Sequence, residues 1–151
     1  GEKSERALRL SKLLTAAGVK SPVRNNIRNE IWLKLWGNLS FNPVSVLTEG
    51  TLGDLACDTG TRRAIRAMME EARPVAEALG VTFAVGIDER MDMAAKIGAH
   101  RTSMLQDVQA GRPTELDALL GVVIELASLV GCHTPALQLV YDLVKFRSRI
   151  G

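Results

Sequence analysis

Three polar side chains recur at a spacing of four residues inside an otherwise apolar segment, residues 31–43. Lys34, Asn38 and Asn42 drift only about 80° around an α-helix, since each residue advances by roughly 100°. Bulky apolar residues, two tryptophans among them, surround the three. We expect such a helix to be buried, and a buried ammonium beside two amides needs a reason. Either the three groups satisfy one another, or they line a pocket for a polar ligand.

Proton transfer and hydroxyl recognition are the chemistry open to this set. Desolvation brings the acidity of a lysine ammonium closer to neutrality. Lys34 is therefore a candidate general acid, which donates a proton to a carbonyl oxygen as a nucleophile or hydride reaches the carbon. The amides of Asn38 and Asn42 offer donors and acceptors without charge, which suits a substrate hydroxyl.

Two further segments carry polar groups where a helical pattern expects apolar ones. Ser103 and Asp107 stand one helical turn apart, and Glu115 begins an apolar helix. Ser103 can hold a carboxylate oxygen, and a Glu115 close to Lys34 would keep the ammonium protonated and oriented. Each residue alone also has a simpler interpretation. A lysine extends to solvent, asparagines and serines pack or cap, and a glutamate at a helix start complements the helix dipole.

Helices must position these groups, because no long stretch alternates apolar and polar residues as a strand does. The pattern predicts helices over residues 4–17, 25 or 26 to about 42, 52–56, 61–79, 88–110 with a possible break at 100–103, 114–130, and 135 to about 147. Ser4 is the expected first N-cap, and Thr114 with Asp117 resembles a capping pair. Pro43 is expected to end or kink its helix, and residues 19–23 to be extended. The predicted fold is all-α, with about six helices after a short αβ segment.

Length and composition exclude several classes of protein. A chain of 151 residues, 46% hydrophobic and 24% charged, suits one globular domain. The net charge of +2 is too small to indicate a nucleic-acid partner. Cys57 and Cys132 form no CxxC pair, which argues against a zinc site and suits the reducing cytoplasm. No apolar run approaches the roughly 20 residues of a membrane span. We therefore predict no metal, no nucleic acid and no membrane as partners.

Four motifs follow one another in an order that resembles one enzyme family. They are Lys34-Leu-x-x-Asn38-x-x-x-Asn42-Pro43, Thr51-Leu-Gly-Asp-Leu55, Ser103-Met-Leu-Gln-Asp107 and Arg112-Pro-Thr-Glu115-Leu-Asp117. Together they resemble the C-terminal half of the 2-dehydropantoate 2-reductase (ketopantoate reductase) family, from Gly1 to the last helix. The resemblance implies a compact helical bundle like the C-terminal domain of 6-phosphogluconate dehydrogenase. Residues 1–22 are then the end of a truncated nucleotide-binding Rossmann domain, and residues 23–151 the helical substrate-binding domain.

The resemblance also implies an activity, the NADPH-dependent reduction of 2-dehydropantoate to (R)-pantoate in pantothenate (vitamin B5 and coenzyme A) biosynthesis. By this resemblance Lys34 is the general acid, and Asn38 and Asn42 hold the hydroxyl side of the substrate. Ser103 holds the carboxylate, and Glu115 contributes to cofactor binding or positions Lys34. NADPH is expected to bind mainly to the Rossmann domain, whose glycine-rich fingerprint this chain lacks. The chain alone is therefore expected to be inactive.

Three positions depart from the family pattern. Leu120 and His100 stand where relatives commonly have asparagine, and Ala136-Leu137 replaces a frequent Val-Asn pair. The sequence therefore indicates the class of reaction, a reductase, more firmly than it indicates the substrate. Two alternatives remain: a reductase of another 2-keto acid or an opine-type substrate, and a non-catalytic helical dimerisation module. The expected protein partners are the chain's own Rossmann domain and, in a homodimer, a second copy.

Overall fold

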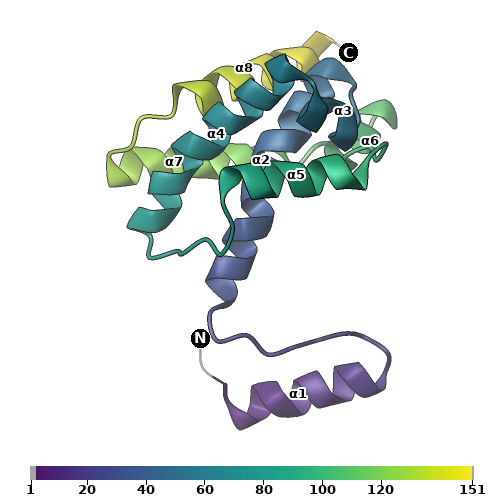
Figure 1. Cartoon of the computed structure of the whole chain (residues 1–151), viewed down its shortest axis with the longest axis vertical. Helices are drawn as coiled ribbons and strands as arrows, with labels where there is room; N and C mark the ends of the chain where they lie inside the picture. Colours follow the sequence, from purple (N-terminus) through teal and green to yellow (C-terminus); the bar gives the residue numbers. More distant parts are fainter. Residues whose placement is uncertain (1–2, 151) are drawn as a thin grey trace.

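The computed structural model describes residues 3–150, and this part of the chain is helical without strands (Figure 1). Its elements are α1 (Glu5–Ala16), α2 (Ile27–Thr48), α3 (Leu52–Cys57), α4 (Thr59–Ala78), α5 (Ile87–Ile97), α6 (Ser103–Gln109), the π-helix η1 (Asp117–Gly121), α7 (Val122–Val130) and α8 (Pro135–Ile150). The predicted all-α class is confirmed. Gly1 and Glu2, at the start of the predicted Rossmann segment, lie outside the described residues, as does Gly151.

Helix α2 is the axis of the helical body and contacts α3, α4, α6, η1 and α8. Trp36 lies at its centre, fully buried. Its indole Nε1 donates a hydrogen bond of 2.8 Å to the carbonyl of Met69 on α4. Its ring lies 4.2 Å from the ring of Phe83, centroid to centroid. Because neighbours cover α2 on several sides, its apolar residues spread around the helix, as expected for a buried element.

Helix α2 continues through Pro43 to Thr48, so the prediction of a helix end near Asn42 is wrong. A proline inside a helix costs about 3 kcal/mol, because one backbone hydrogen bond is lost and the ring clashes with the preceding turn. All residues from 39 to 46 are buried, however. Each fully buried large apolar side chain stabilises the fold by about 1.5–3 kcal/mol. Packing on both sides of Pro43 therefore outweighs the local preference to stop.

The weak stretch near residue 100 does separate two helices, α5 and α6. Gly98 ends α5 with a φ of +71°, a conformation that favours glycine. The N-cap of α6 is Thr102, whose side chain accepts a hydrogen bond from the backbone N–H of Leu105. The helix predicted from Thr114 begins three residues later, at η1.

The predicted capping role of Asp117 is wrong, because another helix takes its carboxylate. Asp117 accepts hydrogen bonds from the hydroxyl of Tyr141 at 2.6 Å and from Nζ of Lys145 at 2.9 Å, both on α8. These two hydrogen bonds lower the pKa of Asp117 below its ordinary value, and the bond from Tyr141 has the larger effect. A contact between residues 24 positions apart thus replaced the local cap.

Helix α1 lies apart from the helical body and buries none of its residues (Figure 1). Ser4 caps it as predicted, accepting a hydrogen bond from the N–H of Ala7. Leu8, Leu10 and Leu13 are exposed. Residues 19–23 are non-helical, as expected, but they form no strand, because a strand needs a neighbour to complete its hydrogen bonds and none lies in the described chain.

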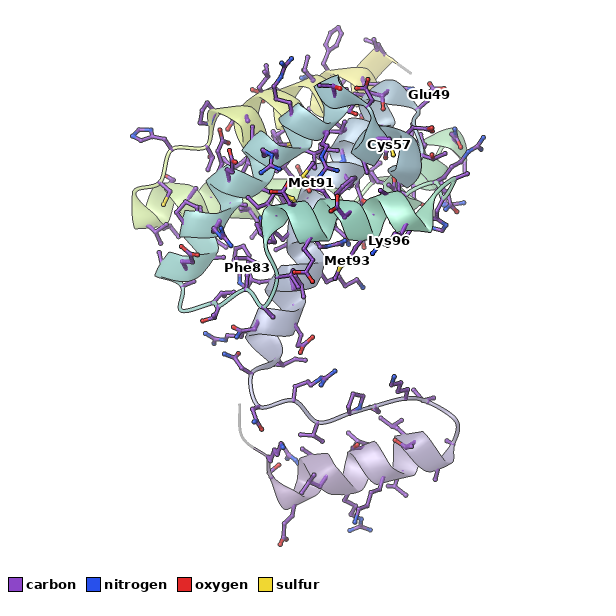
Figure 2. All side chains as sticks on the ribbon, viewed as in Figure 1. Glu49, Cys57, Phe83, Met91, Met93 and Lys96 are labelled. Atoms are coloured by element: carbon purple, nitrogen blue, oxygen red, sulfur yellow. The ribbon has the colours of Figure 1, made fainter. Side chains whose placement is uncertain are left out.

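Unlike the side chains of α1, those of the helical body divide into buried and exposed ones (Figure 2). On α5, Met91 is fully buried, whereas Met93, two residues further on, is 41% exposed. This alternation is what an amphipathic helix at the surface of a core requires. None of the helices in residues 3–150 combines the length and apolar character needed to cross a membrane.

Candidate functional site

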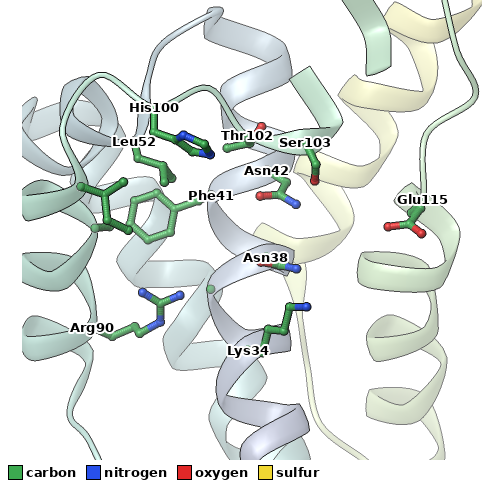
Figure 3. A pocket seen from close by; sticks show the side chains of 13 residues that line it. Lys34, Asn38, Phe41, Asn42, Leu52, Arg90, His100, Thr102, Ser103 and Glu115 are labelled. Atoms are coloured by element: carbon green, nitrogen blue, oxygen red, sulfur yellow. The ribbon is translucent and has the colours of Figure 1, made fainter. Parts of the chain in front are cut away.

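Lys34, Asn38, Asn42, Ser103 and Glu115 line one pocket with a volume of about 340 Å³ (Figure 3). They come from three parts of the fold: the middle of α2, the first residue of α6, and the segment before η1. Residues up to 81 positions apart in the chain, as Lys34 and Glu115 are, therefore meet at one place. Their convergence satisfies the geometric requirement for a site, while their chemical roles stay predictions.

Exposure falls along the polar face of α2. Lys34 is exposed, Asn38 is half-buried, and Asn42 is only 6% exposed. The expectation that the lysine is buried is wrong, because the N-terminal turns of α2 project beyond the helices that cover its other end (Figure 1). In this chain the Lys34 ammonium is solvated rather than enclosed by an apolar wall.

The two asparagines of α2 do not satisfy one another. Within residues 3–150, the side-chain amides of Asn38 and Asn42 take part in no hydrogen bond, and neither amide is sealed from the pocket. Buried or half-buried amides without partners are unfavourable unless water or a ligand reaches them. The sequence left two possibilities, that the three polar groups satisfy one another or that they line a pocket for a polar ligand. The polar face of α2 matches the second.

Ser103 is held near α2 by its buried neighbour. The Oγ1 of Thr102 lies 2.5 Å from Oγ of Ser45 on α2. The Ser45 hydroxyl also lies 2.7 Å from the backbone carbonyl of Asn42, to which it can donate. This buried link fixes the start of α6 against the same turn of α2 that carries Asn42. Ser103 itself is exposed, with its hydroxyl facing the pocket in Figure 3.

Asp107 and Glu115 have different surroundings. The Asp107 carboxylate accepts a 2.9 Å hydrogen bond from Nε of Arg112, forms an ion pair of 2.7 Å with its terminal nitrogen, and does not line the pocket. Glu115 is exposed on the opposite side of the pocket from α2 (Figure 3). No ion pair joins it to Lys34 in the described part of the chain. The expected Glu115–Lys34 pairing is therefore not formed here, although both side chains line the same cavity.

One pocket residue, Arg90 of α5, was missed from the sequence. Its guanidinium lies against the backbone of Gly37: a Cβ built on this glycine would come within 2.8 Å of the Arg90 Cζ. Burial lowers the pKa of Arg90, although an arginine stays cationic. A signal was available, because Arg90 falls among Ile87, Met91 and Ala94, the buried face of α5. It breaks an apolar helical stripe just as Lys34 does.

The departures from the family pattern lie in different places. His100 lines the pocket, and its backbone carbonyl accepts a 2.9 Å hydrogen bond from the N–H of Leu52. Leu120 and Leu137 are fully buried in the core. The N–H groups of Ala136 and Leu137 donate to the carboxylate of Glu71, at 2.8 and 2.9 Å, which caps α8. Of these positions, only His100 contributes to the pocket.

Comparisons with known proteins agree with one another. Residues 26–148 match the family model described as ketopantoate reductase PanE/ApbA C terminal. The chain is 51% identical over 145 residues to a 2-dehydropantoate 2-reductase from Mesorhizobium japonicum, covering 96% of this chain and 44% of that protein. A PanE/ApbA family ketopantoate reductase structure from Ralstonia eutropha JMP134 has a TM-score of 0.89 at 27% identity, covering 97% of this chain and 49% of that one. The 2-dehydropantoate 2-reductase structure from Methylococcus capsulatus has a TM-score of 0.86 at 33% identity, covering 97% and 47%. The chain thus spans about half the length of these relatives.

Proposed function

Because this chain belongs to the ketopantoate reductase PanE/ApbA C-terminal family, we propose that it is the substrate-binding half of an NADPH-dependent 2-dehydropantoate 2-reductase. The observation that carries the proposal is the convergence of the five predicted residues on one open pocket. A purely structural module gains nothing from leaving two asparagine amides without partners. A site that recognises a small polar molecule requires groups of this kind.

The proposed reaction assigns a task to each of the five predicted residues. When bound, NADPH supplies the hydride that reduces the ketone carbon. Lys34 donates a proton from Nζ to the ketone oxygen, so that an alcohol forms rather than an alkoxide. Asn38 and Asn42 hold the hydroxyl side of the substrate, Ser103 donates to its carboxylate, and Glu115 touches the cofactor or orients Lys34.

The division of the whole protein is part of the same proposal. Residues 1–22 belong with a nucleotide-binding Rossmann domain, which binds most of NADPH, and residues 23–151 form the helical domain. The exposed leucines of α1 support this division, since an amphipathic helix is stable when its apolar face is covered. Closure of that domain over the pocket would also desolvate Lys34, which is the condition under which a lysine acts as an acid near neutral pH.

A homodimer is the proposed assembly, with α8 as the contact. Leu139, Leu143, Phe146 and Ile150 are exposed at spacings of four, three and four residues, the pattern of a helix that pairs with another helix. Sedimentation of wild-type protein and the variant Leu143→Glu tests this: the wild type should be dimeric and the variant monomeric.

Reduction of a different 2-keto acid or of an opine-type substrate is the second candidate function. It is favoured by His100, the departure from the family pattern that lines the pocket. A cytoplasmic location is proposed with either substrate, and the two cysteines, Cys57 and Cys132, are free as expected in a reducing compartment.

The test is an assay of the full-length protein, with its nucleotide domain, for substrate-dependent oxidation of NADPH and NADH. We expect the highest kcat/KM with 2-dehydropantoate and NADPH across a panel of 2-keto acids. A clear preference for another keto acid would retain the class of reaction and change the substrate. Absence of reduction for every member of the panel would contradict the proposal.

A further inference from the structure

The pocket contains a cation for which the proposed reaction has no use, Arg90. In residues 3–150 its guanidinium takes part in no hydrogen bond or ion pair, and burial lowers its pKa. Of the three acids of its own helix, Asp88 and Asp92 pair with Arg62 and Arg66 of α4. The third, Glu89, is exposed and does not line the pocket. The guanidinium of Arg90 therefore stands half-buried in the pocket with its donors unused.

The chain accommodates this arrangement at Gly37, a buried glycine in the middle of α2. A glycine inside a helix costs about 1 kcal/mol relative to alanine. Even the smallest side chain at this position would overlap the guanidinium, since its Cβ would lie 2.8 Å from Cζ and 3.1 Å from Nε of Arg90. The glycine thus leaves the space in which the Arg90 guanidinium lies against α2. A half-buried cation without a counter-charge is unfavourable on its own, and an anion in the pocket relieves that cost.

Arg90 is close enough to the proposed acid to act on the same small molecule. Residues 34 and 37 are three apart on α2, so their Cβ positions are separated by about 5–6 Å. With 2.8 Å from the Gly37 Cβ position to Cζ, the guanidinium lies within about 9 Å of the Lys34 Cβ. In Figure 3 the Lys34 ammonium points away from Arg90, and rotation of its flexible side chain can shorten the remaining gap. In a 2-keto acid the carboxylate is bonded directly to the ketone carbon, so one molecule can face both cations.

We propose that Arg90 binds the carboxylate of the 2-keto acid substrate and is the residue that selects an acid over a neutral ketone. This inference rests on the proposed function. A guanidinium matches a carboxylate with two parallel hydrogen bonds, which are charge-assisted and about twice as strong as neutral ones. The Ser103 hydroxyl offers one neutral donor and serves as a secondary partner. The pocket volume of about 340 Å³ is near the lower limit for ligand sites, which suits a small acid.

The test compares acid and amide substrates on the full-length enzyme. Arg90→Met removes the charge at similar volume, Arg90→Lys keeps the charge without the planar pair, and Arg63→Met replaces an exposed arginine of α4 outside the pocket. Steady-state kinetics are measured with the preferred 2-keto acid and with its 2-keto amide. We expect Arg90→Met to lower kcat/KM for the acid by a factor on the order of 10–100, mainly through KM. The amide should change less than threefold, Arg90→Lys should be intermediate, and Arg63→Met should match the wild type.

A second variant tests the same inference without removing the arginine. Gly37→Ala fills the space beside α2 and should also lower kcat/KM for the acid selectively, although alanine favours the helix. Equal losses for acid and amide, or no loss in Arg90→Met, would overturn the inference. So would a loss confined to keto acids with a second carboxylate, which would assign Arg90 to the far end of the substrate. If the wild type reduces no 2-keto acid, the proposed function itself fails, which separates the two outcomes.

Discussion

The two sides of α2 differ in whether their polar groups have hydrogen-bond partners within the protein. On the core side, Trp36, Leu39 and Val46 are fully buried, and polar groups there have partners. The Trp36 indole donates to Met69, and the Ser40 hydroxyl lies 2.9 Å from the Trp36 carbonyl. On the pocket side, the amides of Asn38 and Asn42 and the guanidinium of Arg90 lack partners in the described chain.

This difference separates stability from function within a single helix. Groups that are fully packed and bonded stabilise the folded state, and their loss lowers the free energy of unfolding. Groups left without partners in a pocket contribute little to folding and are available to a ligand. Substitutions on the core side should therefore lower the free energy of unfolding, whereas substitutions on the pocket side should lower the activity of the enzyme.

The largest effect is expected at Lys34, on the pocket side. In the full-length enzyme Lys34→Ala should lower kcat by a factor on the order of 10²–10⁴, the contribution of a general acid. The unfolding temperature should stay near that of the wild type, because the side chain is exposed. Lys96→Ala, an exposed lysine of α5 outside the pocket, is the matched control and should retain activity. A near-normal kcat in Lys34→Ala would remove this lysine from the mechanism.

The next largest effect is expected on the core side, at Leu39. Leu39→Ala should lower the free energy of unfolding of the chain by about 2–5 kcal/mol, since it leaves a cavity beside Trp36. Leu129→Ala on α7, where the leucine is 82% exposed, should change it by less than about 0.5 kcal/mol. Chemical denaturation measures both. Similar losses for the two leucines would contradict the division of α2 into a core side and a pocket side.

Ser45 tests whether the two sides are linked. Ser45→Ala removes the contacts to Thr102 and to the Asn42 carbonyl and should lower the free energy of unfolding by about 1–3 kcal/mol. It should also raise KM in the full-length enzyme, because Ser103 loses its anchor. Ser148→Ala, which removes a comparable contact on α8, should leave KM unchanged. An unchanged KM in Ser45→Ala would show that Ser103 is positioned independently.

The smallest effect is expected away from α2, at Asp117. Hydrogen bonds from Tyr141 and Lys145 lower the pKa of Asp117 in the folded state. The stabilisation is therefore complete above the unfolded pKa of about 3.9 and is lost as the pH falls through the lower, folded value. Asp117→Asn should reduce the fall in melting temperature between about pH 5 and pH 2. If the variant and the wild type lose melting temperature equally over this range, the two hydrogen bonds are not formed in solution.

Local patterns in the sequence were reliable where the cause was local. The Ser4 cap, the break near residues 100–103 between α5 and α6, and the shared face of Lys34 and Asn42 follow from backbone geometry and helical periodicity alone. The family resemblance, carried by short motifs, indicated which polar groups meet. Arg90 was missed even though it interrupts an apolar stripe, the same signal that identified Lys34.

Where distant residues compete with local preference, the sequence alone misled. Pro43 did not end α2, because packing on both sides outweighs a local cost of about 3 kcal/mol. Asp117 did not cap its helix, because Tyr141 and Lys145 reach it from α8. Lys34 was expected to be buried and is exposed, since burial depends on which helices cover each turn of α2.

By itself the sequence determined the all-α class, most helix positions, and the polar face of α2, because these depend on residues within a turn or two of one another. The resemblance implied that Ser103 and Glu115 join that face, but only the tertiary structure brought them together in one pocket and added Arg90 to it. The tertiary structure also decided which polar groups remain without partners. Both depend on contacts between residues far apart in the chain, whose free energies no local pattern encodes.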